Sequence, residues 1–318
     1  MAAGLAAVGF LDQTGLAGKR HWGGAKRGGG KMEPYLAVFS DIDGTLLDSQ
    51  HRLGQETVEA VRRIVAAGVP FVLVSARAPA AVFPIQDELA VATPIVAYGG
   101  ALVLDQDRRP VHSLLVPQTK AREIHSRLAR ERPLVTVTFY SHDDWLVDDT
   151  SHPRVVLEAK ITSLTPIPFD SPGAEDRVVH KILCLGDPGD IAALAEELPE
   201  RYPDLSIFRS SQVFLEIMHG DATKANAVHY LCQALRLPLE RVVAFGDNYN
   251  DVDMLQQAGL GVAMANAPAE VRDGVGRVTE YDNDHDGVAR FLATIPLISA
   301  ATSLRFTRAS FPPPEGKE

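Results

Sequence analysis

The chain of 318 residues is 46% hydrophobic and 23% charged, which excludes disordered, collagen-like and disulfide-scaffold classes and predicts about two globular domains. Its net charge of −10 argues against a nucleic-acid partner, which requires a basic face, and against attachment to an anionic membrane. A single anionic substrate, held in a locally positive pocket, remains compatible with this charge.

Two cysteines, Cys184 and Cys232, lie inside apolar stretches, which predicts reduced, buried thiols and no disulfide framework. No run reaches the ~20 apolar residues that span a bilayer. The first apolar stretch, residues 2 to 11, has no basic region before it, so a secretory signal is not expected. These features predict a cytoplasmic protein without a membrane partner.

Residues 1 to 33 differ in composition from the rest, because nine of the 25 glycines lie in the first thirty positions and the segment has a charge of +3. Such a segment can bury little apolar surface, and we expect a disordered extension. Met32 directly precedes the first strand-like run and is the preferred natural start. A functional basic tail is the alternative.

Strand and helix patterns alternate from residue 35 onwards. Strands are expected at 35–40, 71–75 and 94–97, helices at 55–67 and 79–89, and a hairpin at 101–104 and 111–116. In the first helix, apolar residues recur at spacings of three and four, with charged residues between them. Continuous apolar strands separated by amphipathic helices predict a parallel sheet covered on both faces.

The pattern changes beyond Pro117. Helices are expected at 119–131, near Val155 and from Asp187 to about Glu197, and strands at 134–140, 145–147, 178–185, 205–209 and 213–217. This mixture predicts a separate α+β unit. The parallel pattern then returns, with a helix at 223–236, a strand at 242–245, a short helix after Asp251 and a strand at 260–264.

The second unit is therefore predicted to be inserted into the first. We expect an α/β fold with a Rossmann-like parallel-sheet core at 34–116 and 211–296, an α+β cap at 117–210, and a tail at 297–318.

The first chemical motif is Asp41-Ile42-Asp43-Gly44-Thr45, directly after the first strand. Ligands of open α/β sheets bind outside the carboxyl ends of the strands, where these two carboxylates are expected to lie. Two acids separated by one residue can divide the work, one attacking or holding a metal while the other moves a proton. An ordinary Asp-Gly turn is the alternative.

A second motif, Gly246-Asp247-Asn248-Tyr249-Asn250-Asp251, follows another apolar strand. Carboxylate and amide oxygens at a strand end suit a hard cation such as Mg²⁺. The alternative is that Asn250 or Asp251 caps the next helix, and both readings can hold together. Ser75, with Arg77 two residues later, and Lys224 lie at a strand end or near predicted helix starts, where an anion such as phosphate can bind.

The joint order of these motifs, strand-DxDGTLL, strand-SxR, a lysine at a helix start and strand-GDNxND, resembles the haloacid dehalogenase (HAD) superfamily of aspartate-nucleophile phosphotransferases. More narrowly, the chain is similar to the Cof-type phosphatases, which carry a large α/β cap between the second and third motifs. The resemblance covers residues 34 to 296, although the cap matches in length and layout more than in residues.

The resemblance implies a Mg²⁺-dependent phosphatase acting on a small phosphorylated metabolite, a sugar phosphate or a phosphorylated cofactor. It makes Asp41 the nucleophile and Asp43 the general acid/base. Ser75 and Lys224 would bind the phosphoryl group, with Ala76, Arg77 and Asn250 as further contacts. The metal would be held by Asp41, the carbonyl of Asp43 and Asp247, supported by Asn250 and Asp251.

Three positions depart from the family pattern: Ala76 and Ala225 where glycine is usual, and Gly99 where asparagine is common. None removes a catalytic group, so an active enzyme is expected, as a monomer or homodimer. A phosphohexomutase-like transferase and a non-catalytic binding module are the alternatives. In the inserted unit, residues 142–145 and 148–149 are predicted as a hairpin turn and a solvated edge, with a substrate-facing role as the alternative.

Overall fold

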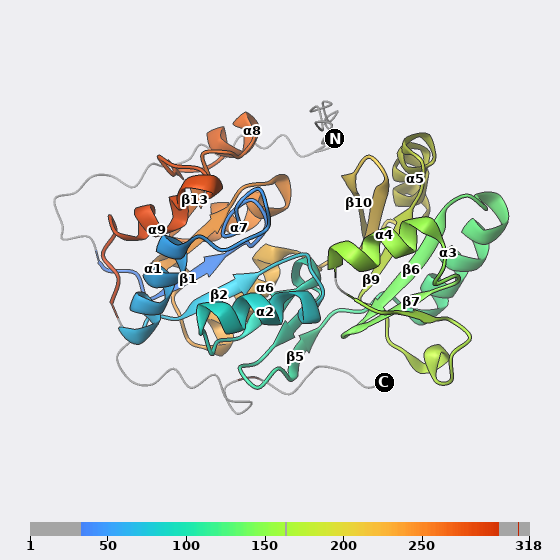
Figure 1. The fold of residues 1–318 in the computed structure, drawn as a ribbon, viewed down its shortest axis with the longest axis horizontal. Helices are drawn as coiled ribbons and strands as arrows, with labels where there is room; N and C mark the ends of the chain where they lie inside the picture. The colour runs from blue at the N-terminus through green and yellow to red at the C-terminus, as the bar shows by residue number, and fades with distance from the viewer. Residues whose placement is uncertain (1–32, 163, 299–310, 312–318) are drawn as a thin grey trace. The chain divides into compact units, whose positions relative to one another are not determined.

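The computed structural model describes residues 33–162, 164–298 and 311. Almost all of the predicted N-terminal extension, and all of the predicted tail except residues 297, 298 and 311, lie outside them. The described residues form two sheets, of eight and six strands (Figure 1). None of the helices among these residues is long and apolar enough to cross a membrane.

The eight-stranded sheet has the order β14-β13-β12-β1-β2-β3-β4-β5. Its strands are β1 (Ala37–Ser40), β2 (Phe71–Val74), β3 (Ile95–Ala97), β4 (Leu102–Leu104), β5 (Pro110–Ser113), β12 (Val242–Gly246), β13 (Leu260–Ala263) and β14 (Arg277–Val278). Pairing is parallel from β14 to β3, and β4 and β5 form an antiparallel hairpin at one edge. In Figure 1 the blue β1 therefore lies beside orange strands from the C-terminal part of the chain.

Helices cover both faces of this sheet, as the continuous apolar strands predict. One face packs against α1 (Gln55–Ala66), α2 (Pro79–Leu89) and α9 (Gly287–Leu292). The other face packs against α6 (Lys224–Ala234), α7 (Val252–Gln257) and α8 (Ala269–Asp273). Alternate residues of the central strands enter the two apolar clusters, for example Val38 and Phe39, so the sheet is buried on both sides.

The six-stranded sheet has the order β10-β11-β9-β6-β7-β8 and is antiparallel except for the pair β7 and β8. Its strands are β6 (Thr136–Ser141), β7 (Asp144–Val147), β8 (Pro166–Pro168), β9 (Lys181–Leu185), β10 (Leu205–Ser211) and β11 (Phe214–His219). One face packs against α3 (Gln118–Glu131) and α5 (Pro188–Arg201), while α4 (Pro153–Thr162) contributes Val155 to a different apolar cluster. The short strand β8 was not predicted, because two of its three residues are prolines, which are uncommon within strands.

The predicted end of the inserted unit at residue 210 requires a correction. Strand β11 pairs with β10 on one side and with β9 on the other, both within the six-stranded sheet. The boundary at 210 would therefore cut the β10–β11 hairpin, and this sheet extends to His219. The sequence pattern of a strand is the same in either sheet, because the periodicity of its apolar residues indicates which side chains are buried and not which strand it pairs with.

The turn between β6 and β7 contacts the eight-stranded unit. Tyr98 donates its hydroxyl hydrogen to the carbonyl of His142, at 2.5 Å, and the backbone of Ala80 is hydrogen-bonded to Asp143. The predicted hairpin turn is confirmed. Asp148 and Asp149 are exposed, as expected of a solvated edge, while His142 and Asp143 at the exposed tip also contact the parallel-sheet unit.

His180 lies in the same contact, fully buried. Its Nδ1 accepts from the backbone N–H of His142, at 3.3 Å, so the neutral ring carries its proton on Nε2, which lies 2.9 Å from the hydroxyl of Ser113. Burial, aided by the neighbouring His142, lowers the pKa of His180 from 6.5 to about 3. The folded protein therefore holds this ring neutral at pH values where the unfolded chain protonates it.

Lowering the pH should therefore weaken the fold through His180. Its contribution to stability is complete above pH 6.5 and is lost as the pH falls towards 3, by about 2 kcal/mol between pH 7.5 and 5. In urea unfolding, the stability difference between the wild type and His180→Gln should shrink by this amount over that range. The exposed control, Gln257→Ala, does not change a titratable group and should show a difference that does not change with pH. A constant difference for His180→Gln would contradict the assignment.

Candidate active site

Three adjacent parallel strands bring the predicted site residues to one edge of the sheet. Asp247 follows β12, Asp41 follows β1 and Ser75 follows β2, and these strands are neighbours in the order β12-β1-β2. The backbone N–H of Asp41 donates to the carbonyl of Phe245, at 3.0 Å, which extends the pairing of β1 and β12 to the site. The carboxyl ends of parallel strands meet at one edge, as expected.

Lys224 joins two of the carboxylates. It is the first residue of α6, whose N-cap Thr223 accepts from the backbone N–H of Asn226. The Lys224 Nζ lies 2.5 Å from Asp41 Oδ1 and 2.5 Å from Asp251 Oδ1. The lysine side chain is only 2% exposed, so its ammonium and both carboxylates form a buried ionic cluster.

Gly100 permits the approach of this helix start to the sheet. Its φ is +114°, a conformation that residues with a side chain rarely adopt, and a Cβ there would lie 2.2 Å from the carbonyl oxygen of Thr223. The neighbouring Gly99 faces the methyl of Met218 on β11, at 3.5 Å from an added Cβ. The position of Gly99, where asparagine is common in the family, therefore faces an apolar side chain.

The cluster holds more negative than positive charge. Burial raises the pKa of Asp41 well above its usual value, and Lys224 opposes that rise while Asp251 and Asp247 add to it. Burial and the nearby Asp251 raise the pKa of Asp247 to about 6. For Lys224 the attraction of the two carboxylates outweighs burial, which acts in the opposite direction, and its pKa is raised. The shifts of the two aspartates therefore reflect burial first and the neighbouring carboxylates second, while that of Lys224 reflects its contact with two carboxylates.

Oxygen atoms of Asp41, Asp247 and Asp251 all lie within 4.8 Å of one another. Three carboxylates with one ammonium provide hard oxygen ligands and an excess of negative charge, which is the donor set that Mg²⁺ prefers. The hydroxyl of Thr45 donates to Asp247 Oδ1, at 3.0 Å, so this hydrogen bond uses only one of the two carboxylate oxygens of Asp247. The residues present therefore fit a divalent metal.

Asp251 is largely occupied by protein contacts. Its Oδ2 accepts the backbone N–H groups of Asp247 and Asn248, at 3.1 and 3.0 Å, while its Oδ1 contacts Lys224. It thereby closes the loop that carries Asp247 and forms a capping box with Asn248. The helix-cap reading and a supporting role beside the cation site are both compatible with this geometry.

The side chain of Asp43 forms a separate ion pair. Arg77 donates from Nε to Asp43 Oδ2, at 2.7 Å, and from Nη2 to Oδ1, at 2.5 Å. His51 lies near the same carboxylate, with Nδ1 3.6 Å from Asp43 Oδ1. Asp43 is 44% exposed, against 8% for Asp41, so one acid of the motif faces the buried cluster and the other faces solvent.

Ser75 is buried, and its Oγ accepts the backbone N–H of Arg77, at 3.1 Å. Ala76, between them, offers its carbonyl to Lys181 of the six-stranded sheet, at 3.4 Å. Asn250 is exposed, and no hydrogen bond among the described residues joins its side chain to the three carboxylates. The structure thus assembles Asp41, Asp247, Asp251 and Lys224 directly and leaves Asn250 apart.

Sequence reasoning missed His51, Lys181 and the pairing role of Arg77. His51 lies in an irregular loop and Lys181 begins an apolar strand, so neither has a pattern that marks it. The Arg77–Asp43 ion pair joins residues 34 positions apart in the sequence. The only sequence feature that could have indicated this pair is that both residues follow predicted strands.

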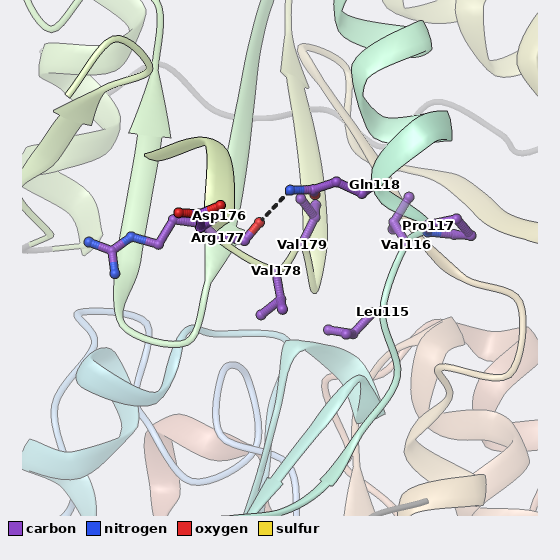
Figure 2. Close-up of a pocket in the computed structure, with 8 residues that line it drawn as sticks. All are labelled: Leu115, Val116, Pro117, Gln118, Asp176, Arg177, Val178 and Val179. Carbon is purple, nitrogen blue, oxygen red and sulfur yellow. Dashed lines mark hydrogen bonds between the residues drawn. The ribbon is translucent and has the colours of Figure 1, made fainter. Parts of the chain in front are cut away.

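A shallow pocket of about 170 Å³ lies away from these residues, at the first link between the two sheets. Figure 2 shows Leu115 and Val178 on facing sides of it and the side chain of Arg177 directed away, while Gln118 donates to the Arg177 carbonyl, at 3.0 Å. None of the predicted site residues lines this pocket. The carboxylate cluster, and not this hollow, is the candidate active site.

A parallel α/β sheet with clustered carboxylates at its carboxyl edge and an inserted α+β unit defines a hydrolase architecture of the kind that the motifs predicted. Residues 38–292 match the haloacid dehalogenase-like hydrolase family. Because this match covers most of the chain, the chain belongs to that family.

Relatives with assigned names support the same class. A Haemophilus influenzae protein whose name classes it as a phosphatase is 41% identical over 258 residues, covering 81% of this chain and 97% of that protein. A Bacillus subtilis relative, named 5-amino-6-(5-phospho-D-ribitylamino)uracil phosphatase, is 28% identical, covering 82% of this chain and 97% of its own. The predicted phosphatase class is confirmed.

The solved structures agree with the predicted fold. A haloacid dehalogenase-like hydrolase from Bacteroides thetaiotaomicron superposes with a TM-score of 0.75 at 27% identity. The superposition covers 82% of this chain and 99% of that protein. The fold class predicted from the sequence is therefore confirmed.

Proposed function

We propose that this phosphatase hydrolyses a small phosphorylated metabolite in a Mg²⁺-dependent reaction that passes through an aspartyl-phosphate at Asp41. The observation that carries the proposal is the buried contact of Lys224 with Asp41, within a cluster of three carboxylates at the carboxyl edge of the sheet. An acid that attacks an anionic phosphoryl group needs positive charge beside it, and this cluster supplies an ammonium and a cation site.

In the first step, a carboxylate oxygen of Asp41 attacks phosphorus and the bond to the leaving alcohol breaks. Lys224 and Ser75 hold the transferring phosphoryl group, so that the attacking and leaving oxygens are in line. The short Lys224 contact supports this role, because it keeps the Asp41 oxygen oriented before substrate arrives. Covalent catalysis then replaces one difficult displacement with two easier ones.

Asp43 serves as the general acid/base. It gives a proton to the leaving alcohol in the first step and takes one from water in the second, which releases phosphate and restores Asp41. Its exposure beside the buried nucleophile supports this division, and Arg77 orients the Asp43 carboxyl group through two hydrogen bonds. Arg77 is therefore a positioning residue in this proposal, with Ala76 contributing backbone near the phosphoryl group.

Asp41, the carbonyl of Asp43 and Asp247 would hold Mg²⁺, with Asp251 and Asn250 supporting the loop. When bound, the metal would offset the negative charge shared by the nucleophile and the phosphoryl group. Burial and the nearby Asp251 raise the pKa of Asp247, and a neighbouring cation would favour its charged form, which supports this assignment.

The substrate that we propose is a sugar phosphate or a phosphorylated cofactor. The name of the Bacillus subtilis relative, a phosphatase of a phosphorylated ribitylamino compound, supports a substrate with a polyhydroxylated leaving group. We also propose a cytoplasmic location, which the two free and buried cysteines support, and a monomer or homodimer without nucleic acid or membrane partners.

Incubation with a panel of hexose phosphates tests the proposal. We expect release of free phosphate in the presence of Mg²⁺, loss of at least about 100-fold of the rate after EDTA, and recovery when Mg²⁺ is restored. Phosphate release is measured colorimetrically, and the sugar products by chromatography. A mock-treated sample, dialysed without EDTA, is the control.

The remaining outcomes separate the alternatives. Isomerised hexose phosphate without free phosphate would identify a mutase and contradict hydrolysis. Full activity in EDTA would contradict the role of Asp247. Binding of a phosphorylated ligand without turnover, under all metal conditions, would support a non-catalytic module.

A further inference from the structure

The face of the six-stranded sheet opposite α3 and α5 carries charged side chains. Leu215 and Ile217 of β11 enter the apolar cluster that packs against those helices. Side chains alternate along a strand, so Glu216 and Met218 lie on the opposite face. Register aligns Met218 with Lys181 of β9, and Lys181 with Tyr140 of β6, so these residues form one row across the sheet.

Lys181 in this row reaches the candidate active site. Its Nζ donates to the carbonyl of Ala76, at 3.4 Å, and lies 4.8 Å from the centre of the Tyr140 ring and 5.7 Å from that of Tyr98. Ala76 separates Ser75 from Arg77, which holds the proposed acid/base Asp43. The ammonium of Lys181 therefore lies beside the loop that carries Ser75 and Arg77.

Glu216 lies beside Lys181 with one oxygen unsatisfied. Its Oε2 is 3.4 Å from Lys181 Nζ, and both side chains are 9% exposed. This oxygen is buried, yet it accepts no hydrogen bond from any described residue. Buried carboxylate oxygens are almost always hydrogen-bonded, so an open acceptor at this position calls for a partner.

A second carboxylate makes this region acceptor-rich. Glu158 of α4 is buried, and its pKa is raised by burial and by Glu216, while Lys181 opposes the rise. Two carboxylates and one ammonium would repel a second phosphate or a carboxylate on the substrate. A cationic group would approach Glu216 only beside the ammonium of Lys181, which repels it.

We propose that Glu216 and Lys181 form a specificity subsite that binds a hydroxyl group on the leaving alcohol of the substrate. A hydroxyl is both donor and acceptor, so it can donate to Glu216 Oε2 and accept from Lys181 Nζ at the same time. The subsite thereby selects polyhydroxylated monophosphates over bisphosphates and over esters without hydroxyl groups. This inference rests on the proposed function.

The test compares Glu216→Gln with the wild type on two kinds of substrate. One is the best substrate found among hexose 6-phosphates, pentose 5-phosphates and alditol phosphates, and the other is p-nitrophenyl phosphate, which has no hydroxyl group. We expect Glu216→Gln to lower kcat/KM for the hydroxylated substrate by about tenfold or more, mainly through KM, and to change that for the aryl ester less than about twofold. Glu196→Gln, an exposed site on α5, should change neither.

Equal losses on both substrates, or no loss on either, would overturn the subsite, as would a wild-type preference for bisphosphates or aminated esters. If circular dichroism shows that Glu216→Gln does not fold, Glu216→Asp takes its place in the test. This variant keeps the negative charge on a shorter side chain, and the same selective loss on the hydroxylated substrate is expected. Failure of the proposed function is a different result, because the wild type would then release no phosphate from any compound, the aryl ester included.

Discussion

Asp41→Asn should abolish the turnover of p-nitrophenyl phosphate, with a loss in kcat of at least about 10³-fold. The amide is isosteric with the carboxylate but is not a nucleophile towards phosphorus. The fold should remain intact, because the substitution removes one negative charge from a buried cluster that has an excess of them. Initial rates, together with circular dichroism and urea unfolding, measure both parts of the prediction.

Asp107→Asn is the matched control for this variant. Asp107 lies in the turn between β4 and β5, half exposed and far in sequence from the motif, and its substitution should leave kcat unchanged. Persistence of turnover in pure Asp41→Asn protein would show that another group attacks phosphorus, and the proposed mechanism would fail.

Lys224→Met should have the largest effect on stability. It leaves Asp41 and Asp251 buried, 8% and 0% exposed, without the ammonium that both contact. Breaking a buried ion pair from one side costs about 3–5 kcal/mol, because an uncompensated charge remains. We expect a loss of this size in urea unfolding at pH 7.5, together with loss of phosphatase activity.

The stability loss should become smaller as the pH is lowered. The pKa of Asp41 is already raised by burial, and protonation relieves the repulsion that the missing lysine no longer offsets. Lys120→Met, which breaks an exposed ion pair with Asp204, should cost less than about 1 kcal/mol at either pH. A Lys224→Met protein as stable as the wild type at pH 7.5 would contradict the electrostatic account of the cluster.

Local patterns in the sequence predicted most elements that carry the site. The helix predicted at 79–89 is observed over those residues, and the strands predicted at 71–75 and 242–245 differ from β2 and β12 by one residue. A strand end is a local property, since apolar residues stop where the backbone leaves the sheet. Asp41, Ser75 and Asp247 could therefore be assigned to strand ends without knowledge of the strand order.

Non-local pairing was harder to predict. The β10–β11 hairpin belongs to the inserted sheet because β11 pairs with β9. The alternation of apolar and polar residues along these strands does not indicate which strand they pair with. The ion pair of Arg77 with Asp43, and that of Lys181 with Glu216, likewise join side chains from different strands or loops. Residues of this kind look like ordinary surface charges in a single sequence.

The sequence by itself therefore determined the family, the α/β class with an inserted unit, and the acids that follow the strands, because periodicity and motif spacing are local. Only the tertiary structure decided which charges meet. Lys224 lies 183 positions from Asp41 and reaches it because Gly100 lets the start of α6 approach the sheet. The net charge of −10 argues against polyanionic partners, whereas the balance of charge inside the buried cluster of Asp41, Asp247, Asp251 and Lys224 depends on the order of the strands.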